Sequence, residues 1–371
     1  MKKKILFLIP NLKHGGAEKV LVNLANNLDQ QKYQLTVQTV FDIGVHRQSL
    51  GSGIRYIPGW KHEFRGYSHV LKLLPPRMLY RWLVKEQYDI VISYLEGVTA
   101  RIVSGCTNPH TQRICWVHTE FSTPKAGAVA FRSIHEARQG YGRFHRIVAV
   151  SDQVRRGFLE NVVHTVPVEV LYNTNETEKI LSLSLEDPPT DVFRPGITHV
   201  CAIGRLLPVK GFDRLLNVHR RLMAEGLDHR ILILGTGEDQ AKLLHAAQQY
   251  GLEDSFRLLG FSDNPYKYLS QCDLFVCSSR REGFSTAVTE ALVVGTAVVS
   301  TDCSGARELL GDHDEYGIVT ENSEEGIYQG MKRMLSDPAL LVHYKQKAKE
   351  RGSFFSRTET VRAVEEMLDN I

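Results

Sequence analysis

The sequence predicts an α/β protein with two parallel-sheet domains, and three observations support this. Its 371 residues suit two domains of ordinary size. Short apolar runs alternate along the chain with helical patterns of roughly 10–15 residues, which is typical of parallel sheets with helices on both faces. Near the middle, the alternation is interrupted at residues 176–196, which contain Pro188, Pro189 and Pro195.

The expected strands are apolar runs rich in Val, Ile and Leu. We expect an N-terminal domain at 1–175, a linker at 176–196, a second domain at 197–352, and a C-terminal helix at 353–371 that packs back toward the N-terminal domain. A ligand cleft is expected between two such domains, at the carboxyl ends of the strands. The expected strands lie at 4–9, 34–40, 54–57, 89–93, 112–117 and 146–150, then at 198–203, 230–234, 255–259, 273–277, 297–300 and 317–320.

Composition excludes several classes of protein. Hydrophobic residues make up 43% and charged residues 23%, which is ordinary for a soluble globular protein. No apolar run approaches the roughly 18 residues that span a bilayer, and the apolar core of residues 1–10 is too short for a signal peptide. The six cysteines are scattered through apolar segments. They indicate reduced core residues in a cytoplasmic protein, without disulfides or a zinc site.

Charge is distributed unevenly along the chain. Residues 1–175 contain 23 Lys and Arg against 12 Asp and Glu, a net charge of +11, and the remainder carries −8. Within the basic half, residues 68–87 interleave apolar side chains with Lys72, Arg77, Arg81 and Lys85. Such a stretch can rest on an anionic membrane. It can equally be a surface helix that buries its apolar side in its own domain, and both interpretations stay open.

Residues 281–290 combine more candidate ligand-binding groups than any other stretch of the sequence. This stretch follows the strand expected at 273–277, turns at Gly283 and opens a helix, whose N-terminal N–H groups can bind an anion. Glu282 and Glu290 add carboxylates, which accept hydrogen bonds from hydroxyl groups. The combination suits a nucleotide sugar, which carries both phosphates and hydroxyls. The alternative is an ordinary helix start with one glutamate facing the dipole and one in solvent.

Candidate ligand-binding residues also follow other strands expected in the second half. Arg205 and Lys210 lie on one loop, where a guanidinium fork and an ammonium group suit two adjacent phosphates. A solvated basic loop is the alternative. Gly235 follows the next strand, and Phe261 follows the one after it, where backbone groups could meet a planar base.

The first domain offers fewer candidates. Gly15 and Gly16 follow the first strand and would let a ligand approach the backbone, although a simple turn explains them as well. The third glycine of a dinucleotide fingerprint is missing. His118 ends another strand and is either a ligand contact or a structural histidine. No metal site is predicted, because nothing completes a site with Cys115 and His118 and the aspartates at 312–314 read as a solvated loop.

Together, these motifs resemble the family-four, group 1 glycosyltransferases, which are retaining enzymes with the GT-B fold. The resemblance covers nearly the whole chain and is strongest at residues 204–211 and in the pair Glu282 and Glu290. It implies two Rossmann-like α/β/α domains that face a central cleft, with acceptor binding in the first domain and nucleotide-sugar binding in the second. The chain departs from the family pattern at Thr174, where Gly is usual, and at Ser285, where Pro is usual.

The resemblance also implies roles for single residues. Arg205 and Lys210 would bind the donor diphosphate, Glu290 the ribose hydroxyls and Glu282 the donor sugar. His118 would contact the sugar, and Gly16 would approach the diphosphate. The implied catalytic residues are Glu282, His118, Arg205 and Lys210, and the implied donor-binding residues are Gly15, Gly16, Asn173, Arg205, Lys210, Gly235, Phe261, Gly283, Phe284, Ser285 and Glu290.

The expected function is that of a retaining hexosyl- or N-acetylhexosaminyltransferase. It would move a sugar from a nucleotide sugar, UDP-linked, to a bacterial cell-surface glycan such as lipopolysaccharide or capsule, or to a lipid-linked oligosaccharide. It would need no metal or other cofactor, bind no nucleic acid, and work in the cytoplasm or on the inner face of the plasma membrane. Two alternatives stay open: a catalytically silent nucleotide-sugar-binding subunit and a nucleotide-sugar epimerase of the same fold.

Overall fold

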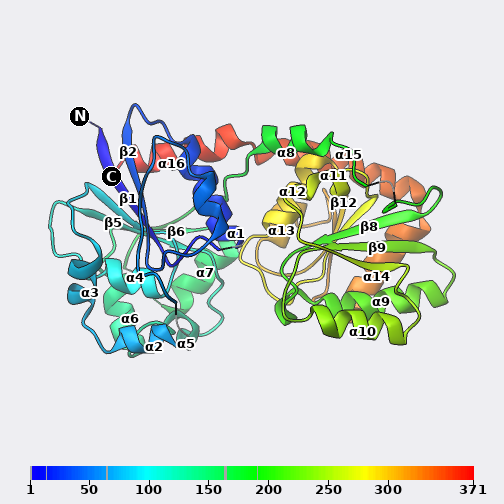
Figure 1. The fold of residues 1–371 in the computed structure, drawn as a ribbon, viewed down its shortest axis with the longest axis horizontal. Helices are drawn as coiled ribbons and strands as arrows, with labels where there is room; N and C mark the ends of the chain where they lie inside the picture. The colour runs from blue at the N-terminus through cyan, green and yellow to red at the C-terminus, as the bar shows by residue number, and fades with distance from the viewer. Residues whose placement is uncertain (1, 14, 64–65, 163–164, 190) are drawn as a thin grey trace. The chain divides into compact units, whose positions relative to one another are not determined.

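The computed structural model describes residues 2–13, 15–63, 66–162, 165–189 and 191–371. The chain forms two compact units, which we call unit 1 (Met1–Thr174 with Thr358–Ile371) and unit 2 (Asn175–Arg357). Each contains one parallel β-sheet with helices on both faces (Figure 1). The predicted fold class, α/β with two parallel-sheet domains, is therefore confirmed.

Unit 1 is built on seven parallel strands and the helices that connect them. Its strands are β1 (Lys3–Ile9), β2 (Tyr33–Thr39), β3 (Arg55–Ile57), β4 (Ile90–Ser93), β5 (Gln112–Val117), β6 (Arg146–Ala149) and β7 (Val168–Val170). Its helices are α1 (Gly16–Asn27), the short 3₁₀ helix η1 (Val45–Ser49), α2 (Tyr67–Lys72), α3 (Pro76–Leu83), α4 (Val98–Val103), α5 (Pro124–Gly127), α6 (Ile134–Tyr141), α7 (Asp152–Asn161) and the C-terminal α16 (Arg357–Asp369).

The strand order of unit 1 is β3-β2-β1-β4-β5-β6-β7. From β1 the chain crosses toward one edge, and from β4 it crosses toward the other. Because such crossovers are right-handed, α1 covers one face of the sheet, and α3, α4 and α6 cover the opposite face (Figure 1). Burial on both faces explains why β1 is a continuous apolar run, with Ile5 and Phe7 as inaccessible as their neighbours.

Unit 2 repeats this plan with six parallel strands. Its strands are β8 (Thr198–Ile203), β9 (His229–Leu234), β10 (Phe256–Gly260), β11 (Leu274–Cys277), β12 (Ala297–Thr301) and β13 (Ile318–Thr320), in the order β10-β9-β8-β11-β12-β13. Its helices are α8 (Thr177–Ser184), the 3₁₀ helix η2 (Pro208–Lys210), α9 (Phe212–Ala224), α10 (Gln240–Gln249), α11 (Tyr266–Leu269), α12 (Thr286–Val294), α13 (Ala306–Leu310), α14 (Glu324–Ser336) and α15 (Pro338–Phe354). In Figure 1, α9, α10 and α14 cover one face of the sheet, and α8, α11, α12 and α15 cover the other.

The predicted strands agree with those of the structure to within one residue at either end. The exception is β7, a three-residue strand at the edge of unit 1 that the sequence does not predict. Its residues are only partly buried, so they lack the continuous apolar character of the central strands. The stretch at 176–196 contains a helix, α8, in which Ile180 packs against Tyr266 and Val293 of unit 2.

The C-terminal helix α16 packs on unit 1, although it follows unit 2 in sequence. The ammonium group of Lys3 donates a hydrogen bond to the carbonyl of Leu368 at 2.8 Å. The hydroxyl of Tyr33 donates to Asp369 at 2.6 Å, and burial together with this carboxylate raises the pKa of the tyrosine. Unit 1 is therefore completed by the last residues of the chain.

The basic stretch at 68–87 forms two short helices, α2 and α3, in place of one. In α3 the apolar side chains of Leu79 and Leu83 are buried, whereas Trp82 is exposed, so both interpretations of this stretch stay open. All six cysteines are buried and carry free thiols, as predicted. None of the described helices combines the length and apolar character that spanning a bilayer requires.

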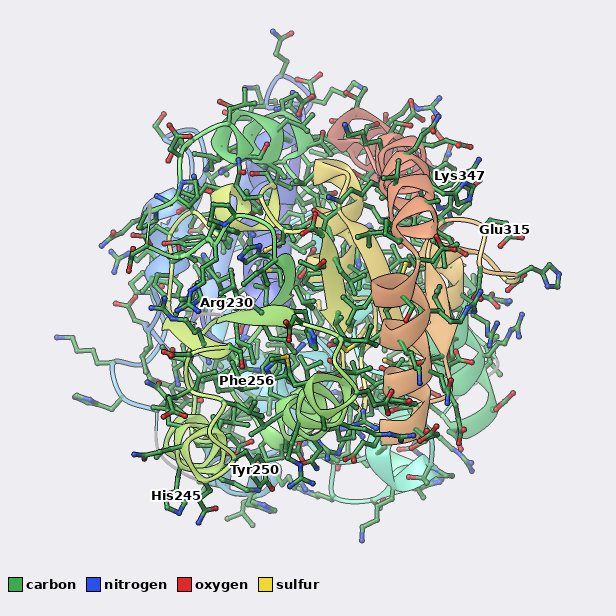
Figure 2. The ribbon with its side chains drawn as sticks, turned by 90° about the vertical axis from the view of Figure 1, so that its right-hand side faces the viewer. Arg230, His245, Tyr250, Phe256, Glu315 and Lys347 are labelled. Atoms are coloured by element: carbon green, nitrogen blue, oxygen red, sulfur yellow. The ribbon has the colours of Figure 1, made fainter. Side chains whose placement is uncertain are left out.

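A chain of neutral histidines is buried in unit 2. The Nδ1 atom of His229 lies 2.7 Å from the carbonyl of Leu227, so it must donate a proton there. Its Nε2 therefore accepts from Nδ1 of His219 at 2.8 Å, and Nε2 of His219 accepts from the hydroxyl of Ser255 at 2.9 Å. Burial lowers the pKa of both imidazoles, that of His219 to about 3. Figure 2 places the neighbouring Phe256 inside the unit and His245 on its surface.

These histidines make the stability of unit 2 depend on pH. An unfolded histidine has a pKa near 6.5, so the unfolded chain binds more protons than the folded chain below that pH. We predict that the free energy of unfolding is highest above about pH 6.5 and falls toward pH 3, by up to about 1.4 kcal/mol per pH unit for each histidine. Denaturant unfolding at a series of pH values across this range measures how the free energy of unfolding changes with pH.

Two variants provide the controls for this prediction. His219→Gln removes one of the two groups and should flatten the slope, provided that the variant folds. His245→Asn removes an exposed histidine and should leave the slope unchanged. The burial argument fails if the wild type shows no loss of stability between pH 6.5 and pH 4 beyond that of the carboxylates.

Candidate functional site

The sheet of unit 2 changes direction between β8 and β11. The chain leaves β8 toward β9 and leaves β11 toward β12, so the connections diverge on either side of this strand pair. In open α/β sheets, ligands bind outside the carboxyl ends of the strands at such a switch point. The loops that border it are residues 204–211 after β8 and residues 278–285 after β11.

Two predicted residues meet at this switch point. The ammonium group of Lys210 lies 2.6 Å from Oε1 of Glu282, and the hydroxyl of Ser279 donates to the same oxygen at 2.6 Å. Burial opposes the charge on Lys210, but the ion pair with Glu282 outweighs it and raises the pKa of the amine. Arg205 is exposed, and its charge opposes the protonated form of Lys210. The result is a lysine that stays charged beside an exposed guanidinium, which suits a diphosphate.

A bidentate ion pair holds the two loops together. Both terminal nitrogens of Arg280 donate to the carboxylate of Asp213, at 2.8 and 2.7 Å. The same guanidinium donates to the carbonyl of Pro208 at 2.6 Å, and the backbone N–H of Arg280 donates to the carbonyl of Val209 at 2.7 Å. Arg280 thus fixes the short helix η2, which carries Lys210, against the loop that carries Glu282.

A second, buried arginine also helps to hold these two loops together. Arg214 is buried, and it donates to the carbonyl of Ser278 at 2.7 Å and to the side-chain oxygen of Asn322 at 3.0 Å. Gly211 lies against the same carbonyl with φ of 67°, and a Cβ there would stand 2.1 Å from the oxygen of Ser278. The approach of the two loops therefore requires glycine at position 211.

The remaining predicted residues of this stretch occupy three environments. Ser285 caps α12, and its hydroxyl accepts from the N–H of Val288. The side chain of Phe284 is buried and packs against Phe355, so it cannot itself contact a ligand. Glu290 is buried within α12 and accepts a hydrogen bond from Tyr266 at 3.3 Å.

Gly235 and Phe261 lie at the ends of neighbouring strands. Gly235 has φ of 143°, and a Cβ there would stand 1.9 Å from the carbonyl oxygen of Gly204. Its N–H donates to the carbonyl of Gly260 at 2.8 Å. These contacts hold the ends of β8, β9 and β10 close together, and Phe261 follows β10 with an exposed side chain.

The predicted residues of the first half lie in unit 1, on the segments that follow β1, β5 and β7. Gly15 caps α1 and Gly16 begins it. The carboxylate of Glu96, which follows β4, accepts from the backbone N–H of His118 at 2.8 Å, and burial raises the pKa of Glu96. Burial lowers the pKa of His118 to about 3, so the imidazole is neutral. Its ring packs beside Tyr94.

Two of the predicted residues each carry an unsatisfied polar atom. Nε2 of His118 and Oδ1 of Asn173 are buried without a hydrogen-bond partner among the described residues. A buried polar atom without a partner costs free energy, which a ligand that supplies the hydrogen bond would recover. Both atoms are therefore suited to a polar ligand.

Sequence reasoning missed three polar residues that shape these regions: Glu96, Ser279 and Arg280. Glu96 and Ser279 follow buried strands, which is the same signal that identified His118 and Arg205. Arg280 gave no signal of its own, because its partner Asp213 lies 67 positions away.

Family models match most of the chain in two adjacent parts. The model described as "Glycosyl transferases group 1" matches residues 193–351, and "Glycosyltransferase Family 4" matches residues 14–179. An N-acetylgalactosaminyltransferase of Campylobacter jejuni, named for its action on a diphospho-undecaprenol-linked saccharide, is 38% identical over 215 residues. The match spans about 56% of this chain and 56% of that relative. The amylovoran biosynthesis glycosyltransferase AmsD of Erwinia amylovora is 26% identical over 93% of both chains.

Solved structures share the fold along the full chain. Anabaena HepE in complex with UDP-glucose matches with a TM-score of 0.80 at 20% identity, covering 100% of both chains. Sucrose-phosphate synthase from Thermosynechococcus elongatus matches with a TM-score of 0.81 at 15% identity, covering 100% of this chain and 99% of that one. The two parallel-sheet units are thus those of GT-B proteins.

The contact between Lys210 and Glu282 predicts how the pKa of the lysine responds to substitution. Glu282→Gln removes the negative charge but leaves the burial, so the pKa of Lys210 should fall below its value in the wild type. NMR titration of ¹³C-methylated lysines measures it, with the exposed Lys242 as an internal control. An unchanged pKa for Lys210 would show that the ion pair does not control the charge.

Proposed function

Because the chain belongs to the group 1 glycosyl transferases, we propose that it moves a sugar from a UDP-linked donor to a bacterial surface glycan or lipid-linked oligosaccharide. The observation that carries this proposal is the meeting of Lys210 and Glu282 at the switch point of unit 2. There a cation for phosphate and an acceptor for hydroxyls stand side by side.

One finding favours a nucleoside diphosphate sugar as donor, and a second favours UDP as its nucleotide. Lys210 and the exposed Arg205 provide positive charge for a diphosphate, which every nucleoside diphosphate sugar carries. Anabaena HepE, which shares the fold, was solved with UDP-glucose. On this proposal Glu282 binds hydroxyls of the donor sugar, Glu290 binds the ribose, and the backbone at Gly283 contacts the sugar or phosphate.

We further propose that transfer retains the configuration of the sugar. The bond between the anomeric carbon and the diphosphate breaks, and the bond to the acceptor oxygen forms on the same face. The acceptor's proton passes to the leaving diphosphate. Lys210 and Arg205 stabilise the negative charge that develops there, so the reaction needs no metal. His118, being neutral, can accept a hydrogen bond from a sugar hydroxyl through Nε2.

The proposed acceptor is inferred from the names of two relatives and from the charge of the first half of the chain. The Campylobacter relative is named for a diphospho-undecaprenol acceptor, and AmsD for amylovoran biosynthesis. A glycan on a diphospholipid would bring the enzyme to the cytoplasmic face of the membrane. The net charge of +11 on residues 1–175 supports contact with anionic lipid there.

Substitution of the two cations tests the donor site. We predict that Lys210→Ala or Arg205→Ala lowers turnover by roughly 10²–10³-fold, because each removes charge that stabilises the leaving diphosphate. UDP release from a panel of UDP-sugars measures it, and Lys242→Ala, which removes an exposed lysine of α10, is the matched control. Turnover within a few-fold of the wild type would remove these residues from the mechanism.

The donor screen also separates the alternatives. A transferase releases nucleotide slowly by hydrolysis and faster with an acceptor. A silent binding subunit releases none, and an epimerase converts the donor sugar without any acceptor. The anomeric coupling constant of the product, read by NMR, tests retention, and an inverted product would exclude the same-face route.

A further inference from the structure

Unit 1 presents an apolar corner between α2 and α3. Leu73 has 76% of its side chain exposed and Val70 has 49%. Val129, on the loop between α5 and α6, is 64% exposed. Single exposed apolar residues are normal in soluble proteins. The features that distinguish this corner are the rigidity of its backbone and the charge around it.

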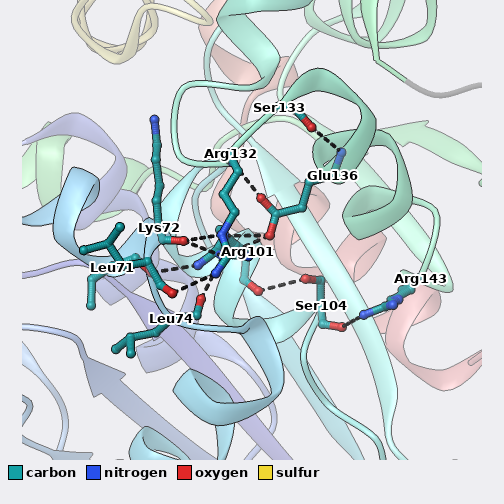
Figure 3. A network of polar contacts seen from close by, with 10 residues as sticks. Leu71, Lys72, Leu74, Arg101, Ser104, Arg132, Ser133, Glu136 and Arg143 are labelled. Carbon is teal, nitrogen blue, oxygen red and sulfur yellow. Dashed lines mark hydrogen bonds and ion pairs between the residues drawn. The ribbon is translucent and has the colours of Figure 1, made fainter.

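A buried arginine fixes the backbone of the corner. Arg101, on α4, is 1% exposed. Its guanidinium donates to the carbonyl of Leu71 at 2.9 Å, to that of Leu74 at 2.8 Å and to that of Lys72 at 3.2 Å (Figure 3). The carboxylate of Glu136, on α6, balances the charge at 2.9 Å.

A second arginine ties the other loop to the same place. Arg132 donates to the carbonyls of Lys72 at 2.5 Å and Leu73 at 2.8 Å (Figure 3). It lies three residues after Val129, so these bonds anchor the loop that carries Val129 at the corner. The carbonyls of residues 71–74 are therefore directed toward two guanidinium groups, and the side chain of Leu73 is left in solvent.

The segments that form the corner are basic and lack acids. Residues 66–85 and 121–135 contain no Asp or Glu, and they carry Lys72, Arg77, Arg81, Lys85, Lys125 and Arg132. Among the carboxylates beside these segments, Glu136 is paired with Arg101 and accepts from the N–H of Arg132, and the charge of Glu63 acts on Tyr67. Exposed apolar side chains on a fixed backbone, in segments whose charged residues are all basic, complement an anionic bilayer surface.

We propose that this corner is where the protein rests on an anionic phospholipid bilayer. Leu73, Val70 and Val129 enter the headgroup layer, and the surrounding lysines and arginines meet the phosphates. Helix α3 buries Leu79 and Leu83 in unit 1 and leaves Trp82 exposed, so it does not present its apolar side as a whole to the bilayer. The inference deepens the membrane contact of the proposed function, and it assigns that contact to a corner built from two separate segments.

Vesicle binding tests the proposal. We expect the wild-type protein to co-sediment with vesicles of phosphatidylcholine and phosphatidylglycerol, and much less with phosphatidylcholine alone. The double variant Leu73→Asp with Val129→Asp should bind about tenfold more weakly or worse, since it removes apolar burial and adds negative charge. Leu185→Asp, at a residue of unit 2 that is 84% exposed, should bind like the wild type.

A charge variant and a soluble assay complete the experiment. Lys125→Gln should weaken binding roughly fivefold, the effect of about one basic residue at an anionic surface. Hydrolysis of the donor in solution should be unchanged in the corner variants. Equal binding by the wild type and the double aspartate variant, or no preference for anionic vesicles, would overturn the proposal. Absent donor turnover in every protein would instead count against the proposed function.

Discussion

The candidate site depends on one ion pair, between Lys210 and Glu282. Its two residues lie on loops that follow β8 and β11, the strands from which the chain diverges in opposite directions. Neither loop alone would hold a charged group in this partly buried place at low cost. Each loop supplies the counter-charge of the other, so Lys210 stays protonated before any ligand arrives.

Arginine is the recurrent means by which this protein fixes loops. Arg280 and Arg214 hold the two loops of unit 2, and Arg101 and Arg132 hold the corner of unit 1. In all four cases the guanidinium donates to backbone carbonyls that belong to no strand ladder. A planar group with five donors can satisfy several carbonyls at once, which a lysine cannot do in a fixed geometry.

The architecture was predictable from the sequence because parallel strands buried on both faces are continuous apolar runs. The edge strand β7 escaped prediction for the same reason, since Val168–Val170 is short and only half buried. Chemistry after strands pointed to Lys210, Glu282 and His118. Residues that act through distant partners, such as Arg280 with Asp213, leave no pattern along the chain. The exposure of Leu73 could not be predicted either. Leu71 and Leu74 are leucines as well, and nothing in the sequence distinguishes the exposed one from its neighbours.

The position of α16 bears on how the protein is made. Unit 2 is a continuous segment, whereas the sheet of unit 1 receives Leu368 and Asp369 against Lys3 and Tyr33. During synthesis on a ribosome, unit 2 has its whole sequence available before unit 1 does. The earlier-translated half must therefore wait, with the surface that α16 will cover still open to water, until the final helix emerges.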